Sequence, residues 1–216
     1  MYRRAAAILG TCLVIGAAAP GRTHPHIYVD TALRLLVNAE GQATAVEVTW
    51  RYDDFYSLLI FEDRNLDPDA DGVLTEEEVQ SLQKWDLAWV EGFAGDLYLT
   101  DATGAEVNLG APEDLGTTVT DGRIESRHRR SIRPATPVEG LTARAYDPEF
   151  YTAYALSLGV TVSADDCAVT ITAPDQGKAA QEARSLMAVY PEDATDVPML
   201  GHLFAETAEV RCDSAG

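Results

Sequence analysis

A run of eleven residues from Ile27 to Val37 alternates side chains in a way that constrains the fold more than any other stretch. Its odd positions are Ile27, Val29, Thr31, Leu33, Leu35 and Val37. Period-two alternation of this length is typical of a β-strand that buries one face. The opposite face carries Tyr28 and Asp30, and extending the strand backwards adds His24 and His26. We therefore predict a strand whose histidine-bearing face points away from the core.

The segments that follow predict a β-rich fold. Residues 38–42, NAEGQ, supply turn residues, and a second alternating stretch at 46–51 completes a β-hairpin. Beyond Gly95, short alternating stretches are separated by Gly, Pro and Asp turn signals, which is typical of a β-sandwich or a related antiparallel layer. Residues 175–189 favour a helix, and residues 204–212 a last strand.

A helical insertion interrupts this β pattern at about residues 52–94. Apolar residues at helical spacing precede an acidic loop, and a second helix is predicted after it. That second helix would run through Val79, Leu82, Trp85 and Trp89. The predicted fold class is α+β, a β-rich antiparallel sandwich-like domain with a helix-loop-helix insertion.

The first nineteen residues have the pattern of a secretory signal peptide. Arg3 and Arg4 precede an apolar stretch, and small Ala17, Ala18 and Ala19 fit a cleavage site. We expect residues 1–19 to be removed and residues 20–216 to form a single exported β-rich domain. No run of eighteen or more apolar residues follows the leader, so we expect no transmembrane segment in the mature chain.

The charge balance favours cations as partners. The formal net charge is −19, and removing the two leader arginines takes it to −21. Nucleic acids and anionic lipids bind through Lys and Arg that neutralise phosphate, so this surface would repel them. We expect metal ions, and no nucleic acid, among the ligands.

The strongest motif is a calcium loop at residues 67–78, DPDADGVLTEEE, which matches the twelve-position EF-hand pattern. Carboxylates occupy positions 1, 3 and 5, glycine occupies position 6, and a glutamate that can chelate through both oxygens occupies position 12. The predicted calcium ligands are Asp67, Asp69, Asp71, Val73 through its carbonyl, Thr75 and Glu78. Only one such loop is visible, which favours a structural calcium over a regulatory one. The alternative is an acidic turn without an ion.

Two cysteines remain after the leader is removed, Cys167 and Cys212. In an oxidising compartment such a pair suggests one disulfide, which would close a loop of 46 residues counting both cysteines. The competing interpretation is a pair of metal-binding thiolates.

Two of the four histidines, His24 and His26, flank Pro25 at the predicted mature edge. Neutral imidazole is a common ligand for zinc, nickel and copper, and alternate strand residues can direct two rings at one ion. Two ligands do not make a tight site. The candidates to complete it are Asp30, His128, His202 and Glu206. The alternative is a pair of exposed polar residues at the start of a strand.

Several stretches together resemble a known bacterial family. They are HPHIYVD after the leader, VEVTWRYDDFYSLLIFED, LDPDADGVLTEEE, AYDPEFYTAY and LFAETAEVRC, and they cover nearly all of the mature chain. The family is called domain of unknown function 1007, and its members are described as the periplasmic component of an uncharacterised ABC-type transport system. The resemblance implies a role near nickel, cobalt or zinc transport, with His24 and His26 as metal ligands. In this chain PGRT separates the leader from the motif, whereas family leaders often end directly before it.

These observations lead to a ranked set of functions. The first is a periplasmic metal-binding accessory protein of a zinc, nickel or cobalt transport system, with a structural calcium and a membrane permease or ABC transporter as partner. Copper is a further candidate metal. The second is a calcium-stabilised adaptor without a second metal, and the third is a metal-dependent hydrolase. We expect that the protein is not an enzyme, because its sequence has no nucleophile elbow, zinc-protease motif or phosphate-binding glycine loop.

Overall fold

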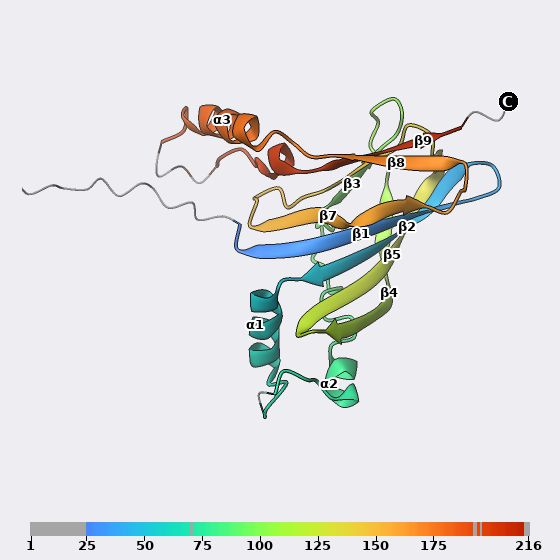
Figure 1. Cartoon of the computed structure of the whole chain (residues 1–216). Coiled ribbons are helices and arrows are strands. Elements are labelled where there is room, and N and C mark those ends of the chain that lie inside the picture. Colours follow the sequence, from blue (N-terminus) through green and yellow to red (C-terminus); the bar gives the residue numbers. More distant parts are fainter. Residues whose placement is uncertain (1–24, 70, 192–193, 195, 214–216) are drawn as a thin grey trace, which may run out of the picture.

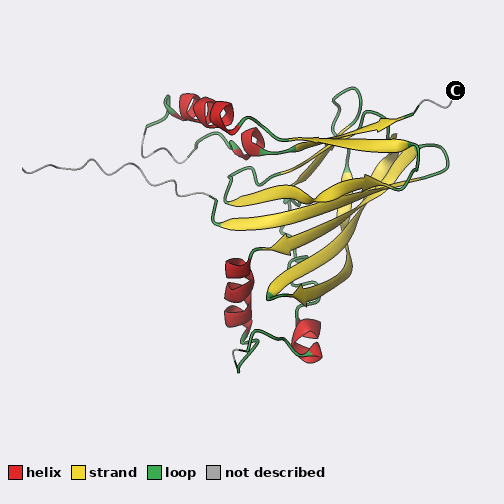
Figure 2. Ribbon diagram, in the orientation of Figure 1, coloured by secondary structure: helices red, strands yellow, loops and turns green. Residues whose placement is uncertain are grey.

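The structure is a computed structural model that describes residues 25–69, 71–191, 194 and 196–213. The predicted signal peptide and His24 lie outside the described residues. Nine strands form two sheets (Figures 1 and 2). The larger sheet has the order β4 (Leu109–Thr120), β5 (Arg123–Pro137), β2 (Gln42–Tyr52), β1 (Ile27–Val37) and β7 (Thr152–Val162). The smaller one has the order β3 (Leu97–Thr100), β6 (Thr142–Ala145), β9 (Thr207–Cys212) and β8 (Cys167–Thr172).

The predicted hairpin at the start of the domain is present as β1 and β2. The turn between them is closed by the Asn38 amide, which donates to the Gln42 carbonyl at 2.9 Å, and Gly41 takes the positive φ of 71° that the turn requires. In the register that follows, Leu33 lies opposite Val48. Both side chains are buried, which confirms that the odd face of β1 points into the core.

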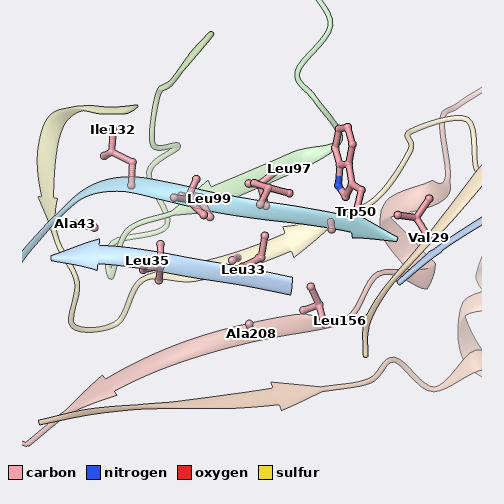
Figure 3. Close-up of a cluster of buried hydrophobic side chains, with 14 of the residues drawn as sticks. Val29, Leu33, Leu35, Ala43, Trp50, Leu97, Leu99, Ile132, Leu156 and Ala208 are labelled. Atoms are coloured by element: carbon pink, nitrogen blue, oxygen red, sulfur yellow. The ribbon is translucent and has the colours of Figure 1, made fainter. Parts of the chain in front are cut away.

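The core lies between the two sheets. Figure 3 shows buried side chains of β1 and β2 together with Leu97 and Leu99 of β3 and Ala208 of β9. Leu35, Val46 and Val210 are fully buried. The alternating apolar residues of both sheets therefore meet in one layer, as a sandwich requires.

The larger sheet is mixed, whereas a purely antiparallel sheet was predicted. β1 pairs with β2 antiparallel but with β7 parallel, and Ile27 lies opposite Thr152. The smaller sheet is antiparallel throughout. Alternation reports which face of a strand is buried and carries no information about the direction of its neighbour, so the pattern could not distinguish the two pairings.

The second helix of the insertion is shorter than predicted. Helix α1 spans Asp54–Arg64 and α2 spans Glu76–Ser81, and both lie near the β2, β5 and β4 strands (Figure 1). The prediction that α2 continues through Trp89 is wrong, because Lys84 takes a left-handed φ of 64° and residues 82–94 form turns and loop. Leu82 is nevertheless fully buried. The apolar spacing correctly indicated burial, and the burial did not need a helix.

Two further helical segments lie in the C-terminal part of the chain. Helix α3 spans Gln176–Met187, close to the predicted range, and η1 is a 3-10 turn at Gly201–Phe204. Among the described residues, no helix is both long enough and apolar enough to cross a membrane.

Cys167 and Cys212 form a disulfide, as predicted. They lie directly opposite each other in the β8–β9 pairing, at the end of the smaller sheet. The bond therefore fixes the last strand of the chain to its neighbour.

We expect the Cys167→Ser/Cys212→Ser variant to be less stable than the wild type by roughly 2–4 kcal/mol, because the unfolded chain gains the freedom of the opened loop. Urea denaturation followed by circular dichroism measures the difference. Wild-type protein treated with a reductant should lose the same stability, and unchanged midpoints in both would contradict the prediction.

Candidate functional site

The acidic loop of the insertion is held at both ends by the fold. Helix α1 ends at Asn65, whose left-handed φ of 54° turns the chain into the loop. The next helix begins with Thr75 as its cap, and Thr75 and Glu78 form a complete capping box. Leu66 and Leu74 pack against the core on either side of the acidic residues. The loop is thereby anchored while its carboxylates remain at the surface.

The first three carboxylates of the loop face one another. One oxygen each from Asp67, Asp69 and Asp71 can be chosen so that all lie within 4.8 Å. The backbone brings them together, because the Asp67 carboxylate accepts hydrogen bonds from the amides of Asp71 and Gly72, each at 3.0 Å. Gly72 takes a φ of 78°, the positive value that position 6 of the pattern demands.

Glu78 connects the two ends of the loop. Its Oε1 accepts from the Asp67 amide at 2.9 Å, and its Oε2 accepts from the amide and the hydroxyl of Thr75, each at 2.8 Å. These hydrogen bonds, that from the Thr75 amide foremost, lower the pKa of Glu78. The twelfth position of the motif therefore lies against the first and the ninth, and its carboxylate is kept ionised.

The described charges of the loop have no basic partner in the described part of the chain. In the described residues neither the three aspartates nor Glu78 forms an ion pair with Lys, Arg or His. The charge of Asp71 is the main reason that the pKa of Asp69 is raised. This repulsion is what a bound cation would relieve. The donor set fits calcium, with Val73 available through its carbonyl and Thr75 through water or its hydroxyl.

Of the six residues proposed for a transition metal, the five that the structure describes do not form one cluster. His24 lies outside the described residues. Within the described ranges, no group of three or more His, Cys, Asp or Glu other than the loop aspartates has its ligand atoms within 4.8 Å of one another. His26 is exposed, with its ring centroid 4.8 Å from that of Tyr151.

The remaining candidates are engaged in other contacts. Asp30 accepts from Ser157 at 2.6 Å and from Arg123 at 2.8 Å, and these contacts, Ser157 first, lower its pKa. Glu206 accepts from the Leu156 amide at 2.6 Å. The helical turn that would have placed His202 and Glu206 on one face ends at Phe204. Asp30 and Glu206 are thus already hydrogen-bonded to other groups of the fold.

His128 is a fully buried histidine in the middle of β5. Its ring lies edge-on to Trp50 at 4.7 Å and to Trp89 at 5.5 Å. Neither ring nitrogen has a hydrogen-bond partner among the described residues. Burial, assisted by the nearby Arg130 charge, lowers the pKa of His128 to about 4, so the ring is neutral at pH 7. It functions here as an aromatic core residue.

Two buried carboxyl groups were not identified from the sequence. Asp86 lies in the loop after α2 and accepts from the Tyr52 hydroxyl at 2.9 Å and from Ser126. Asp96 is 6% exposed and accepts from the Tyr154 hydroxyl at 2.9 Å. Burial raises the pKa of Asp86, and it raises that of Asp96 to about 7. Both stand singly in unremarkable loop sequence, so no spacing pattern could have revealed them.

Acid should destabilise the wild type more than a His128→Leu variant. The folded-state pKa of about 4 lies below the ordinary value of about 6.5, so the contribution of His128 to stability is present above pH 6.5 and is lost as the pH falls through 4. Between pH 7 and pH 4 the wild type should lose about 3 kcal/mol more than the variant, measured by urea denaturation.

The wild-type curve alone cannot isolate this effect. The raised pKa of Asp96 contributes stability that is present below about pH 4 and lost as the pH rises through 7, the opposite direction. Both proteins retain Asp96, so their difference reports His128. Parallel pH profiles of the two proteins would contradict the prediction.

The comparisons with known proteins agree with the resemblance. The chain matches a family described as a protein of unknown function (DUF1007) over residues 9–212. No curated protein sequence matches it. The family match spans almost the whole chain, including the acidic loop, both sheets and the disulfide, and the chain therefore belongs to the DUF1007 family.

Proposed function

We propose that this protein is a periplasmic cation-binding protein whose Asp67–Glu78 loop holds calcium. The observation that carries the proposal is the cluster of three aspartate carboxylates within 4.8 Å, with no basic partner among the described residues. The disulfide supports export, because such bonds persist in oxidising compartments. The net charge of −19 supports a cationic ligand.

Calcium suits this loop better than magnesium or zinc. The donors are all oxygens, and the glutamate at position 12 offers two of them, which suits the six to eight ligands of calcium. Magnesium demands a nearly ideal octahedron, and zinc prefers nitrogen and sulfur. The anchoring of Leu66 and Leu74 on the core supports a structural role, in which the ion stabilises the insertion.

Replacing Glu78 with Gln should weaken calcium binding at least tenfold, because position 12 loses its charge and its bidentate chelation. Isothermal titration calorimetry of the mature protein measures the affinity. Gln at this position still supports a capping box, so the start of α2 should be preserved. In the wild type, calcium at about 100 times its Kd should add about 2.7 kcal/mol of stability.

Glu77→Gln is the matched control. It removes the same charge one residue earlier, at an exposed position that the calcium pattern does not use. Its affinity should stay within about twofold of the wild type. Equal affinities in Glu78→Gln and Glu77→Gln would show that the loop does not bind calcium in the proposed way.

The second part of the proposal concerns His24 and His26. His26 is exposed immediately before β1, and its amide donates to the Tyr151 carbonyl at 2.8 Å, which fixes the backbone that carries the imidazole at the surface. The family resemblance extends this to an accessory of a zinc, nickel or cobalt transport system, with a membrane permease or ABC transporter as the partner. In that role the histidine pair would capture the metal, and calcium would stabilise the domain.

A His24→Ala/His26→Ala variant should bind zinc, nickel or copper at least tenfold more weakly than the wild type, because imidazole is the ligand class these ions prefer. Calorimetric titration with each metal, in the presence of calcium, measures the loss. His202→Ala removes an imidazole from a different part of the fold and serves as the control. If all three proteins bind equally, the histidine pair is not the site, and the calcium-stabilised adaptor becomes the better hypothesis.

A further inference from the structure

A cavity of about 290 Å³ lies where the end of β2 meets α1 and the loop after α2. Its lining residues come from five separate stretches of the chain and are mostly aromatic. They are Ile27, Trp50, Tyr52, Tyr56, Trp85, Asp86, Phe93, Asp96, Thr152 and Tyr154. The volume is at the lower end of the range of about 300–1,000 Å³ found for small-molecule sites. Ile27, Tyr56 and Thr152 are partly exposed, which gives a small ligand a route from solvent.

The aromatic rings form walls around this space and do not stack flat on one another. Tyr52 is tilted by 41° to Tyr56 and by 60° to Trp85, with ring centroids 5.4 Å and 5.1 Å apart. On the other side, Trp50 and Tyr154 are tilted by 48° at 5.8 Å. Ring faces carry partial negative charge, so a cation in this space is attracted to each ring whose face it contacts.

Two of the polar residues that line the cavity, Asp86 and Asp96, are acidic. Asp86 and Asp96 are held by the hydroxyl groups of Tyr52 and Tyr154, so each carboxyl group and the ring beside it are positioned together. In the described part of the chain neither carboxyl group forms an ion pair. Burial without a counter-ion raises the pKa of both groups. A bound cation would supply the missing charge.

A separate observation points to an absent ligand. Asp86 Oδ1 is buried and has no hydrogen-bond partner among the described residues. Buried polar atoms are normally paired, and an unpaired one is destabilising. Trp85 has the exposed Arg64 guanidinium 5.8 Å from its ring centroid, so this ring already attracts a cation in the folded chain.

We propose that this cavity binds a small organic ammonium ion. A metal ion fits poorly, because the two carboxyl groups belong to no cluster of three or more metal-ligating side chains in the described ranges. Aromatic walls suit a weakly hydrated ammonium group, whereas a metal ion requires a shell of close oxygen or nitrogen donors. The inference is independent of the calcium loop and of His26, since neither contributes to the lining.

The test is a titration of the mature, calcium-loaded protein with choline and tetramethylammonium, followed by calorimetry and by tryptophan fluorescence. The neutral control ligand is 3,3-dimethylbutan-1-ol, which has the shape of choline without its charge. Choline should bind at least tenfold more tightly than this alcohol. A parallel titration with phosphatidylcholine vesicles distinguishes a lipid headgroup from a free ammonium ion as the ligand. Binding of either supports the proposal.

Two variants locate the binding. Asp96→Asn preserves shape and removes the ionisable group, and it should weaken choline binding at least tenfold above pH 7, while Asp63→Asn removes an exposed charge from α1 and should change it less than about twofold. Circular dichroism establishes that both variants fold. Four outcomes would each overturn the proposal. The first two are equal binding of choline and its neutral analogue, and equal choline binding by the two variants. The others are binding of neutral sugars only, and no binding of either cation at about 10 mM.

Discussion

The burial of one face of the β1–β2 hairpin determines the rest of the structure. Leu33 and Val48 oppose each other inside the sandwich, while their neighbours Arg34 and Glu47 form an ion pair at the surface. A slip of one residue would exchange these pairs and bury both charges, so the register is strongly specified. The alternation of buried residues in β2 continues to the end of the strand through Trp50 and Tyr52. The alternation that builds the core therefore also supplies one wall of the aromatic cavity.

Features that depend on neighbours in the sequence could be predicted. The alternation from Ile27 to Val37 gave the right buried face, and the turn at residues 38–42 gave the right hairpin, because strand burial and turn geometry are local properties. The acidic loop is local in the same sense. The positive φ of Gly72 and the capping box of Thr75 and Glu78 follow from residue types within twelve positions. Predicting the disulfide between the two cysteines needed only one additional assumption, namely that the protein is exported to an oxidising compartment.

Features that depend on distant pairing could not be predicted. The parallel contact of β1 with β7 joins segments more than a hundred residues apart, and alternation has no direction. Leu82 and Trp85 have helical spacing because both face the core, yet the chain reaches them through turns after Ser81. His128 was a candidate ligand by residue type, but its position on β5 places it between two tryptophan rings. The cavity combines five stretches, so no single motif could have indicated it.

The two proposed cation sites differ in a way that follows from the hydration of their ligands. The loop aspartates are at the surface, where water screens their repulsion and a strongly hydrated ion can exchange its shell for carboxylate and carbonyl oxygens. Asp86 and Asp96 are surrounded by aromatic rings, and a strongly hydrated ion would lose its water there without gaining enough oxygen ligands. An ammonium group loses less on desolvation and gains attraction from each ring face that it contacts. The two proposed sites would therefore hold different cations without competition between them, because each site lacks the groups that the other ligand requires.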